Sequence, residues 1–194
     1  MGEKIPISGP TAKDSLSIKY EDVFSFKELY KAIRDWLIVN EYASDKKDEE
    51  MEKLYLEKQS GAGVRELWIW WRNSKAPHGS KYFKYVINID YHVLNMKDVE
   101  IMHKGSKIKA NKGEVEILIN CYLQTEAEFE IEKSMFRFIA NLFRKRIYRQ
   151  EVEQHKKELQ EDMFSLQHEI KQFLELKGFL PKSELLHPLR GLPG

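Results

Sequence analysis

The sequence has little cysteine, little uncompensated charge and no long apolar run. Cys121 is the only cysteine among 194 residues, so no disulfide can form within the chain, which suits a reducing compartment. The 32 basic residues nearly balance the 31 acidic ones, so no overall field favours nucleic acid or membrane. Nothing approaches the roughly 18 consecutive apolar residues of a membrane span, and residues 1–11 lack the apolar core of a signal peptide. We therefore expect a cytoplasmic protein.

Enough apolar and aromatic residues are present to bury a substantial core. The chain is 42% hydrophobic and 12% aromatic, and its 32% charged residues favour solubility over disorder. Its length suits one domain. We predict an irregular or partly extended arm over residues 1–20, a single α+β domain over 21–178 and an extended, proline-rich tail over 179–194.

Two helices are predicted before the sheet. Ser25 and Glu28 have the spacing of a capping box, and Phe24 and Leu29 stand at the positions of a hydrophobic staple. Apolar residues then recur at helical spacing, which predicts a helix from Phe26 that fades near residue 42. A second helix is predicted over residues 46–59.

From residue 64 the apolar period changes to two, which is typical of strands. The alternation predicts strands over residues 64–73, 81–94, about 98–104, 107–110 and 115–131. Asn111-Lys112-Gly113 has the composition of a hairpin turn. These segments predict an antiparallel meander.

The stretch ELWIWWR, residues 66–72, holds three of the four tryptophans. In a strand, Leu67, Ile69 and Trp71 point to one face, and Trp68 and Trp70 point to the other. One face can meet helices. The other needs a cover of its own or serves as a binding surface.

Helical spacing returns over residues 133–148 and 149–177, which form either two helices or one long bent helix. Residues 133–157 hold eight basic residues against Glu151 and Glu153, and their apolar side chains are spread widely around the helix. Such a helix suits an anionic membrane interface or a groove on a partner protein. The structural alternative buries both sides, one under the sheet and one under residues 149–177. Nucleic acid is disfavoured, because the neighbouring strand carries a row of glutamates.

Candidate catalytic groups are not assembled in the sequence. Asp90, His92 and His103 could share a polar sheet face, yet they lack a diagnostic metal-ligand spacing. Cys121 stands in an apolar row as a small hydrophobe, and His155 and His168 are too far apart on one helix to share a metal. We predict no catalytic residue, no metal and no cofactor.

Four segments resemble a group of small uncharacterised archaeal proteins. They are LWIWWR (67–72), NIDYHVL (88–94), VEIMHKGSKIKANKGEVEI (99–117) and LFRKRIY (142–148), and the resemblance covers most of residues 24–190. It implies a cytosolic α+β protein of unassigned function. It transfers no catalytic or binding residue.

The predicted fold is α+β. A curved antiparallel meander of four to five strands carries two N-terminal helices and one or two long C-terminal helices on one face. The expected function is a non-catalytic interaction module, in which a basic amphipathic helix docks to a protein partner or an anionic membrane surface through Phe138, Leu142, Arg144, Lys145 and Arg146. The alternative is a binder or enzyme with a small apolar ligand between sheet and long helix, lined by Trp68, Trp70, Tyr82 and Tyr122. Self-association through residues 149–177 is a third possibility.

Overall fold

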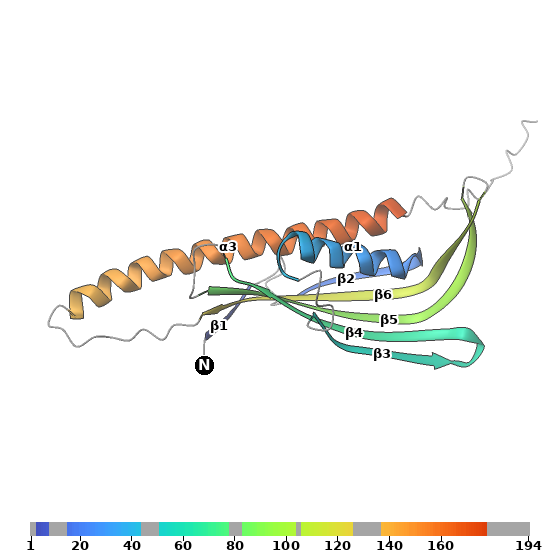
Figure 1. The fold of residues 1–194 in the computed structure, drawn as a ribbon, viewed down its shortest axis with the longest axis horizontal. Helices are drawn as coiled ribbons and strands as arrows, with labels where there is room; N and C mark the ends of the chain where they lie inside the picture. Colours follow the sequence, from blue (N-terminus) through green and yellow to red (C-terminus); the bar gives the residue numbers. More distant parts are fainter. Residues whose placement is uncertain are drawn as a thin grey trace, which may run out of the picture.

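The long strands β5 (Phe83–His103) and β6 (Ser106–Thr125) form the centre of the fold. The computed structural model describes residues 3–7, 15–43, 51–77, 83–103, 106–125 and 137–177. Its antiparallel sheet has six strands. Their order is β1 (Glu3–Pro6), β6, β5, β4 (Val64–Lys75) and β3 (Glu52–Ser60), and β2 (Ser15–Phe24) also pairs with β6. Helices α1 (Phe26–Val39) and α3 (Arg137–Lys177) lie on the same side of the curved sheet (Figure 1). The predicted α+β class and antiparallel sheet are confirmed, and the sheet is larger than expected.

Two strands pair end to end with β6 and form one edge of the sheet. β1 (Glu3–Pro6) lies opposite residues 122–125 of β6, and β2 (Ser15–Phe24) lies opposite residues 111–120. Within the segment predicted as an irregular or partly extended arm, residues 1–20, the described residues 3–6 and 15–20 therefore form regular strands. Their short alternating pattern becomes a strand because β6 offers it a ladder partner.

Strands β3 (Glu52–Ser60) and β4 (Val64–Lys75) form a hairpin around the turn η1 (Gly61–Gly63). Gly63 has a φ of 72°, a conformation that glycine adopts without a steric penalty. The predicted helix over residues 46–59 is wrong for residues 52–59, and residues 46–50 lie outside the described part of the chain. Pairing with β4 overrides the helical pattern, because Leu54 and Leu56 fall opposite the tryptophans of the neighbouring strand.

Strands β5 and β6 are continuous where the sequence predicted shorter strands and a turn at residues 111–113. Their pairing shifts between Leu94 and Lys97, and Asn95 has a φ of 52°, which marks a bulge. Gly113 faces this bulge, where a Cβ atom would lie 2.8 Å from the carbonyl oxygen of Leu94. The glycine therefore allows two backbones to approach closely and does not form a turn. Both strands curl toward the helix side at that end of the sheet (Figure 1).

Helix α1 begins at Phe26, as its start signals predict. The side chain of the N-cap residue Ser25 makes no capping hydrogen bond. Instead, the backbone N–H of Phe26 donates to Oδ1 of Asn111 in β6, at 3.1 Å. The sheet thus supplies the cap that the sequence pattern assigned to Ser25.

Helix α3 is one continuous helix of 41 residues, not two helices. Its buried residues recur at the predicted spacing: Val152, Leu159, Met163, Leu166 and Ile170. Residues 149–151 are exposed, and the first part of α3 extends beyond the end of the sheet (Figure 1).

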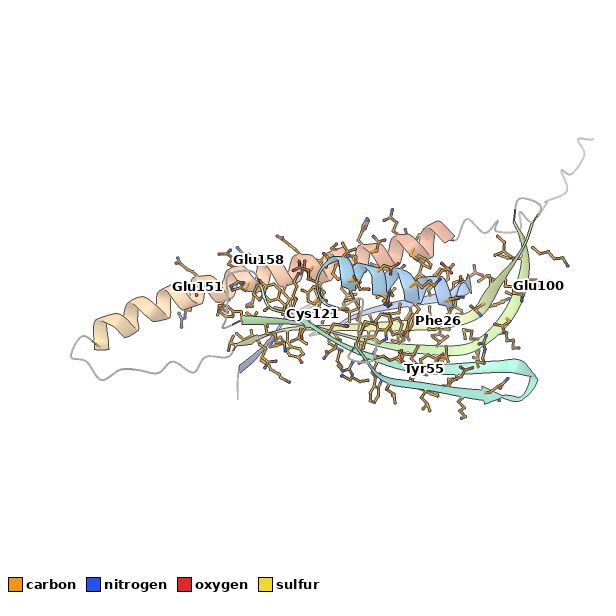
Figure 2. All side chains as sticks on the ribbon, in the orientation of Figure 1. Phe26, Tyr55, Glu100, Cys121, Glu151 and Glu158 are labelled. Carbon is orange, nitrogen blue, oxygen red and sulfur yellow. The ribbon has the colours of Figure 1, made fainter. Side chains whose placement is uncertain are left out.

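The main core lies between the helices and the inner face of the sheet, which is the face toward α1 and α3. Leu67, Ile69 and Trp71 of β4 are almost completely buried there, as their alternation predicts. The Trp71 ring meets Tyr30 of α1 and Tyr91 of β5 edge-on, at 4.6 and 5.0 Å between centroids. Side chains fill the space between sheet and helices (Figure 2).

Candidate functional site

The outer face of the sheet, opposite the helices, carries the second set of ELWIWWR side chains. Trp68 lies opposite His92, and Trp70 lies opposite Asp90. Tyr122 lies opposite Val86 on the same outer face. These three aromatic residues therefore point away from the long helix and cannot line a space between it and the sheet, as the ligand hypothesis required. Tyr82 lies outside the described residues.

An apolar strip runs along the outer face at the β3–β4 hairpin. Two cross-strand pairs define this outer strip: Leu54 with Trp70, and Leu56 with Trp68. Leu56 is 51% exposed and Trp70 is 44% exposed. Large apolar side chains in register on two strands form a contiguous surface, whereas scattered exposed residues do not. Within the described part of the chain, both helices pack on the inner face and leave this strip uncovered.

Polar residues border the outer strip. The His92 ring stacks on Trp68 at 5.2 Å between centroids, and its Nε2 lies 3.2 Å from Glu66 Oε1. Arg72 contacts Asp90 and lies over the Trp70 ring, 5.8 Å from its centroid. An apolar centre with a polar border is the usual composition of a protein-binding surface.

The same contacts involve Asp90 and His92, two of the three residues considered as a metal or acid–base site. Asp90 is paired with Arg72, and His92 with Glu66, so the two are engaged separately. The side chain of His103 lies outside the described residues. Among the side chains that the structure describes, no three histidine, cysteine or acidic groups converge as metal ligands.

A second polar group lies under α3, at the opposite side of the sheet. This α3 polar cluster consists of Tyr42, Lys75, Tyr85, His155, Glu158 and Asp162. Asp162 Oδ2 accepts a hydrogen bond from the Tyr42 hydroxyl at 2.7 Å and lies 2.7 Å from Lys75 Nζ. The Lys75 ammonium also lies 4.3 Å from the Tyr42 ring centroid. One carboxylate on α3 therefore ties the end of β4 to the segment after α1.

Tyr85 connects β5 to the other members of the cluster. Its hydroxyl donates to Glu158 Oε2 at 2.6 Å, so His155 Nδ1, also at 2.6 Å, must act as the donor to the tyrosine oxygen. Burial, followed by the hydrogen bond with Glu158, raises the pKa of Tyr85. The same hydrogen bond from Tyr85 lowers the pKa of Glu158.

The α3 polar cluster is better suited to holding α3 on the sheet than to catalysis. Burial raises the pKa of Tyr42 and raises the pKa of the neighbouring Cys121 to about 12, so phenol and thiol stay protonated at neutral pH. Each charged group already has a partner within the cluster. The arrangement therefore clamps α3 to the sheet without presenting an activated nucleophile.

Sequence reasoning treated His155 as an ordinary helix residue and missed this cluster. The available signal was the spacing of His155, Glu158 and Asp162, which places three polar residues along the apolar stripe of one helix. Polar groups at core-facing positions need partners, which predicts a polar network on the facing strand.

The predicted partner-binding residues Phe138, Leu142, Arg144, Lys145 and Arg146 all lie on α3. Their side chains are outside the part that the structure describes. Among the described residues, no helix is both long enough and apolar enough to cross a membrane.

Comparison with known proteins found no relative. No protein-family model, no curated protein and no solved structure matches the chain. The resemblance to small archaeal proteins stays a prediction. Function must be inferred from the geometry alone.

Proposed function

We propose that this protein is a non-catalytic interaction module that docks to a protein partner through the outer strip. The main support for this proposal is that Leu56 and Trp70 are 51% and 44% exposed. They lie next to Leu54 and Trp68 on paired strands, so the four side chains form one surface. Tryptophan contributes strongly to interfaces because it buries a large rigid surface at a small entropic cost.

The chemistry of the other polar site supports a binding role. The α3 polar cluster joins three elements, and its hydrogen bonds and ion pairs are made between the protein's own groups. Such a network holds a scaffold rigid. A rigid sheet presents the outer strip without a large entropic cost on binding.

Affinity purification with a matched pair of variants tests this function. Leu56→Ser combined with Trp70→Ser removes the exposed apolar groups of the strip, whereas Val39→Ser removes an apolar side chain that is 79% exposed at the end of α1. Quantitative comparison from native cells should show specific proteins, including untagged copies of this chain, retained by the wild type and Val39→Ser but lost from the double variant. Equal retention by all three would refute docking through the strip.

A second candidate function is peripheral contact with an anionic membrane through residues 137–148. One observation favours it: α3 is one continuous helix, so residues 149–177 cannot fold back over residues 137–148. The alternative in which both sides of this segment are buried required such a fold-back. The segment contains Arg144, Lys145 and Arg146 together with aromatic residues. Apolar insertion and attraction to anionic lipid would act together.

Liposome co-sedimentation separates this candidate from protein docking. Binding should require phosphatidylserine, weaken with salt and fall when Arg144, Lys145 and Arg146 are all changed to Gln. Recovery with neutral vesicles equal to recovery with anionic vesicles would refute it.

A further inference from the structure

The two edges of the sheet differ in how far they are protected. At one edge, β1 and β2 lie end to end along β6 as separate segments of four and ten residues, and Pro6 removes a backbone donor from β1. At the other edge, β3 runs for nine residues without proline and pairs on one side only, with β4, among the described strands. Residues 55–60 of β3 are all exposed. Among the described strands, the β3 edge therefore offers an unbroken row of backbone groups over residues 54–60 with which a further strand can pair.

The sequence of β3 is complementary to itself in one antiparallel register. In an antiparallel pair, two opposite residues either both direct their backbone N–H and C=O groups toward the other strand or both direct them away, and these two states alternate along each strand. When the two strands are copies related by a two-fold axis, the axis must therefore pass through a residue and not between two residues. With the axis at Tyr55, Leu54 faces Leu56 of the second copy. Lys53, which lies at the pairing shift between Glu52 and Leu54, comes next along the strand and approaches Glu57 of the second copy. Each of these pairs occurs twice. The register therefore combines apolar contact with opposite charges.

Neighbouring registers lose this complementarity. An axis at Leu56 places Leu54 against Lys58 and leaves Lys53 opposite Gln59. An axis at Glu57 or at Lys58 places like charges directly opposite each other, which is destabilising. Among these registers, only the one at Tyr55 combines leucine pairs with opposite charges across the axis.

The same register continues rows of side chains that already cross the sheet. On the outer face, Leu56 next to Trp68 meets Leu54 next to Trp70 of the second copy. On the inner face, Tyr55 lies beside Ile69, and the 50% exposed Tyr55 rings of the two copies meet at the axis. Tyr55 marks the sheet edge farthest from α3 (Figure 2), so the helices do not block this approach.

We propose that a second copy of this chain is the partner, paired through antiparallel β3 edges with Tyr55 at the two-fold axis, so that the outer strips of the two copies meet edge to edge at Leu54 and Leu56. This inference rests on the proposed function and names its partner. The product is a continuous sheet across two protomers, in which the two outer strips join into one apolar row.

Sedimentation velocity and site-specific cross-linking test the assembly and its register. Across a concentration series the wild type should approach twice the chain mass of 23.1 kDa. Under mild oxidation, Tyr55→Cys should form a disulfide-linked dimer, because opposite Cα atoms in an antiparallel pair are about 4.5–5.5 Å apart. Gln59→Cys should not, since its two copies would be about 27 Å apart along the strands. Native Cys121 is buried and gives no background.

Charge exchange provides a second test that does not depend on cysteine chemistry. Lys53→Glu and Glu57→Lys should each weaken self-association by about tenfold or more, because each creates two like-charge pairs. An equimolar mixture of the two variants should recover dimer, since both cross-axis pairs are then complementary. Lys107→Glu, at an exposed position in β6, is the matched control and should leave the dimer intact.

The outcomes separate this inference from the function on which it rests. A chain that stays monomeric at all concentrations, or cross-links equally at residues 55 and 59, refutes β3 pairing in this register. Failure of Leu56→Ser with Trp70→Ser to release any retained protein refutes docking through the outer strip.

Discussion

The sharpest stability prediction compares two tyrosines on the inner face of the same strand. Tyr85 and Tyr91 are 2% and 1% exposed, so replacing either with Phe removes one oxygen from a buried site. The Tyr85 hydroxyl donates to Glu158 and contacts His155. The Tyr91 hydroxyl has no hydrogen-bond partner among the described residues. The two substitutions should therefore change the free energy of unfolding in opposite directions.

The expected magnitudes follow from these contacts. Tyr85→Phe breaks a hydrogen bond to a carboxylate, which contributes roughly 1.5–3 kcal/mol when charged, and the 45% exposure of the Glu158 side chain brings this to about 1–2 kcal/mol. Tyr91→Phe removes a buried group that lost its water without gaining a partner, so stability should stay the same or rise by about 1 kcal/mol. The difference between the variants should be about 2 kcal/mol.

Urea unfolding followed by circular dichroism measures this difference directly. The m-values should be equal, since neither change alters the surface exposed on unfolding, and the midpoints should move apart. Equal destabilisation by both substitutions would show that the Tyr85 hydrogen bonds add nothing to the attachment of α3, and would refute the reasoning.

Three further predictions address the clamp and the sheet. Asp162→Ala should lower the free energy of unfolding by about 2–4 kcal/mol, because it leaves the mostly buried Lys75 ammonium and the Tyr42 hydroxyl without their acceptor; urea unfolding checks this, and a loss below about 0.5 kcal/mol contradicts it. Because the folded-state pKa of Glu158 is lowered, its ionised form stabilises the fold above the unfolded pKa of about 4.3, and that contribution is lost as pH falls through the folded pKa. Thermal melts of the wild type should therefore fall more steeply in acid than those of Glu158→Gln, and parallel curves would exclude this linkage. Gly113→Ala should destabilise by about 1–3 kcal/mol, because its Cβ would meet the Leu94 carbonyl at 2.8 Å, whereas Gly61→Ala, with no heavy atom within 4 Å of its Cβ, should have little effect; similar urea midpoints would contradict the bulge argument.

The parts of the fold that the sequence predicted are those in which one element determines its own pattern. The alternation of Leu67, Ile69 and Trp71 correctly predicted the inner face of β4, and the stripe from Val152 to Ile170 correctly predicted the buried side of α3. Both patterns arise because each element buries one face against a large core.

The failures occur where a partner distant in sequence decides the local structure. The spacing of Leu54 and Leu56 predicted a helix, but pairing with β4 makes this segment a strand. Gly113 was predicted to lie in a turn, but it allows the Leu94 backbone to approach β6 closely. Asn111 capping α1 from another strand has no local signal at all. The candidate site is a similar case: exposure of Trp70 depends on what the rest of the chain covers, which periodicity alone does not determine.

The pairing of β2 with β6 has a consequence for synthesis of the chain. Ser17 donates a hydrogen bond to Glu116, 99 positions later, so β2 has no ladder partner until β6 has left the ribosome. Chain entropy must be lost before these distant contacts form, which makes such a topology slow to fold. The apolar side of β2 and the unanchored helix α1 are then exposed during translation. A chaperone acting on the nascent chain should therefore engage the first forty residues, and release them when β6 emerges.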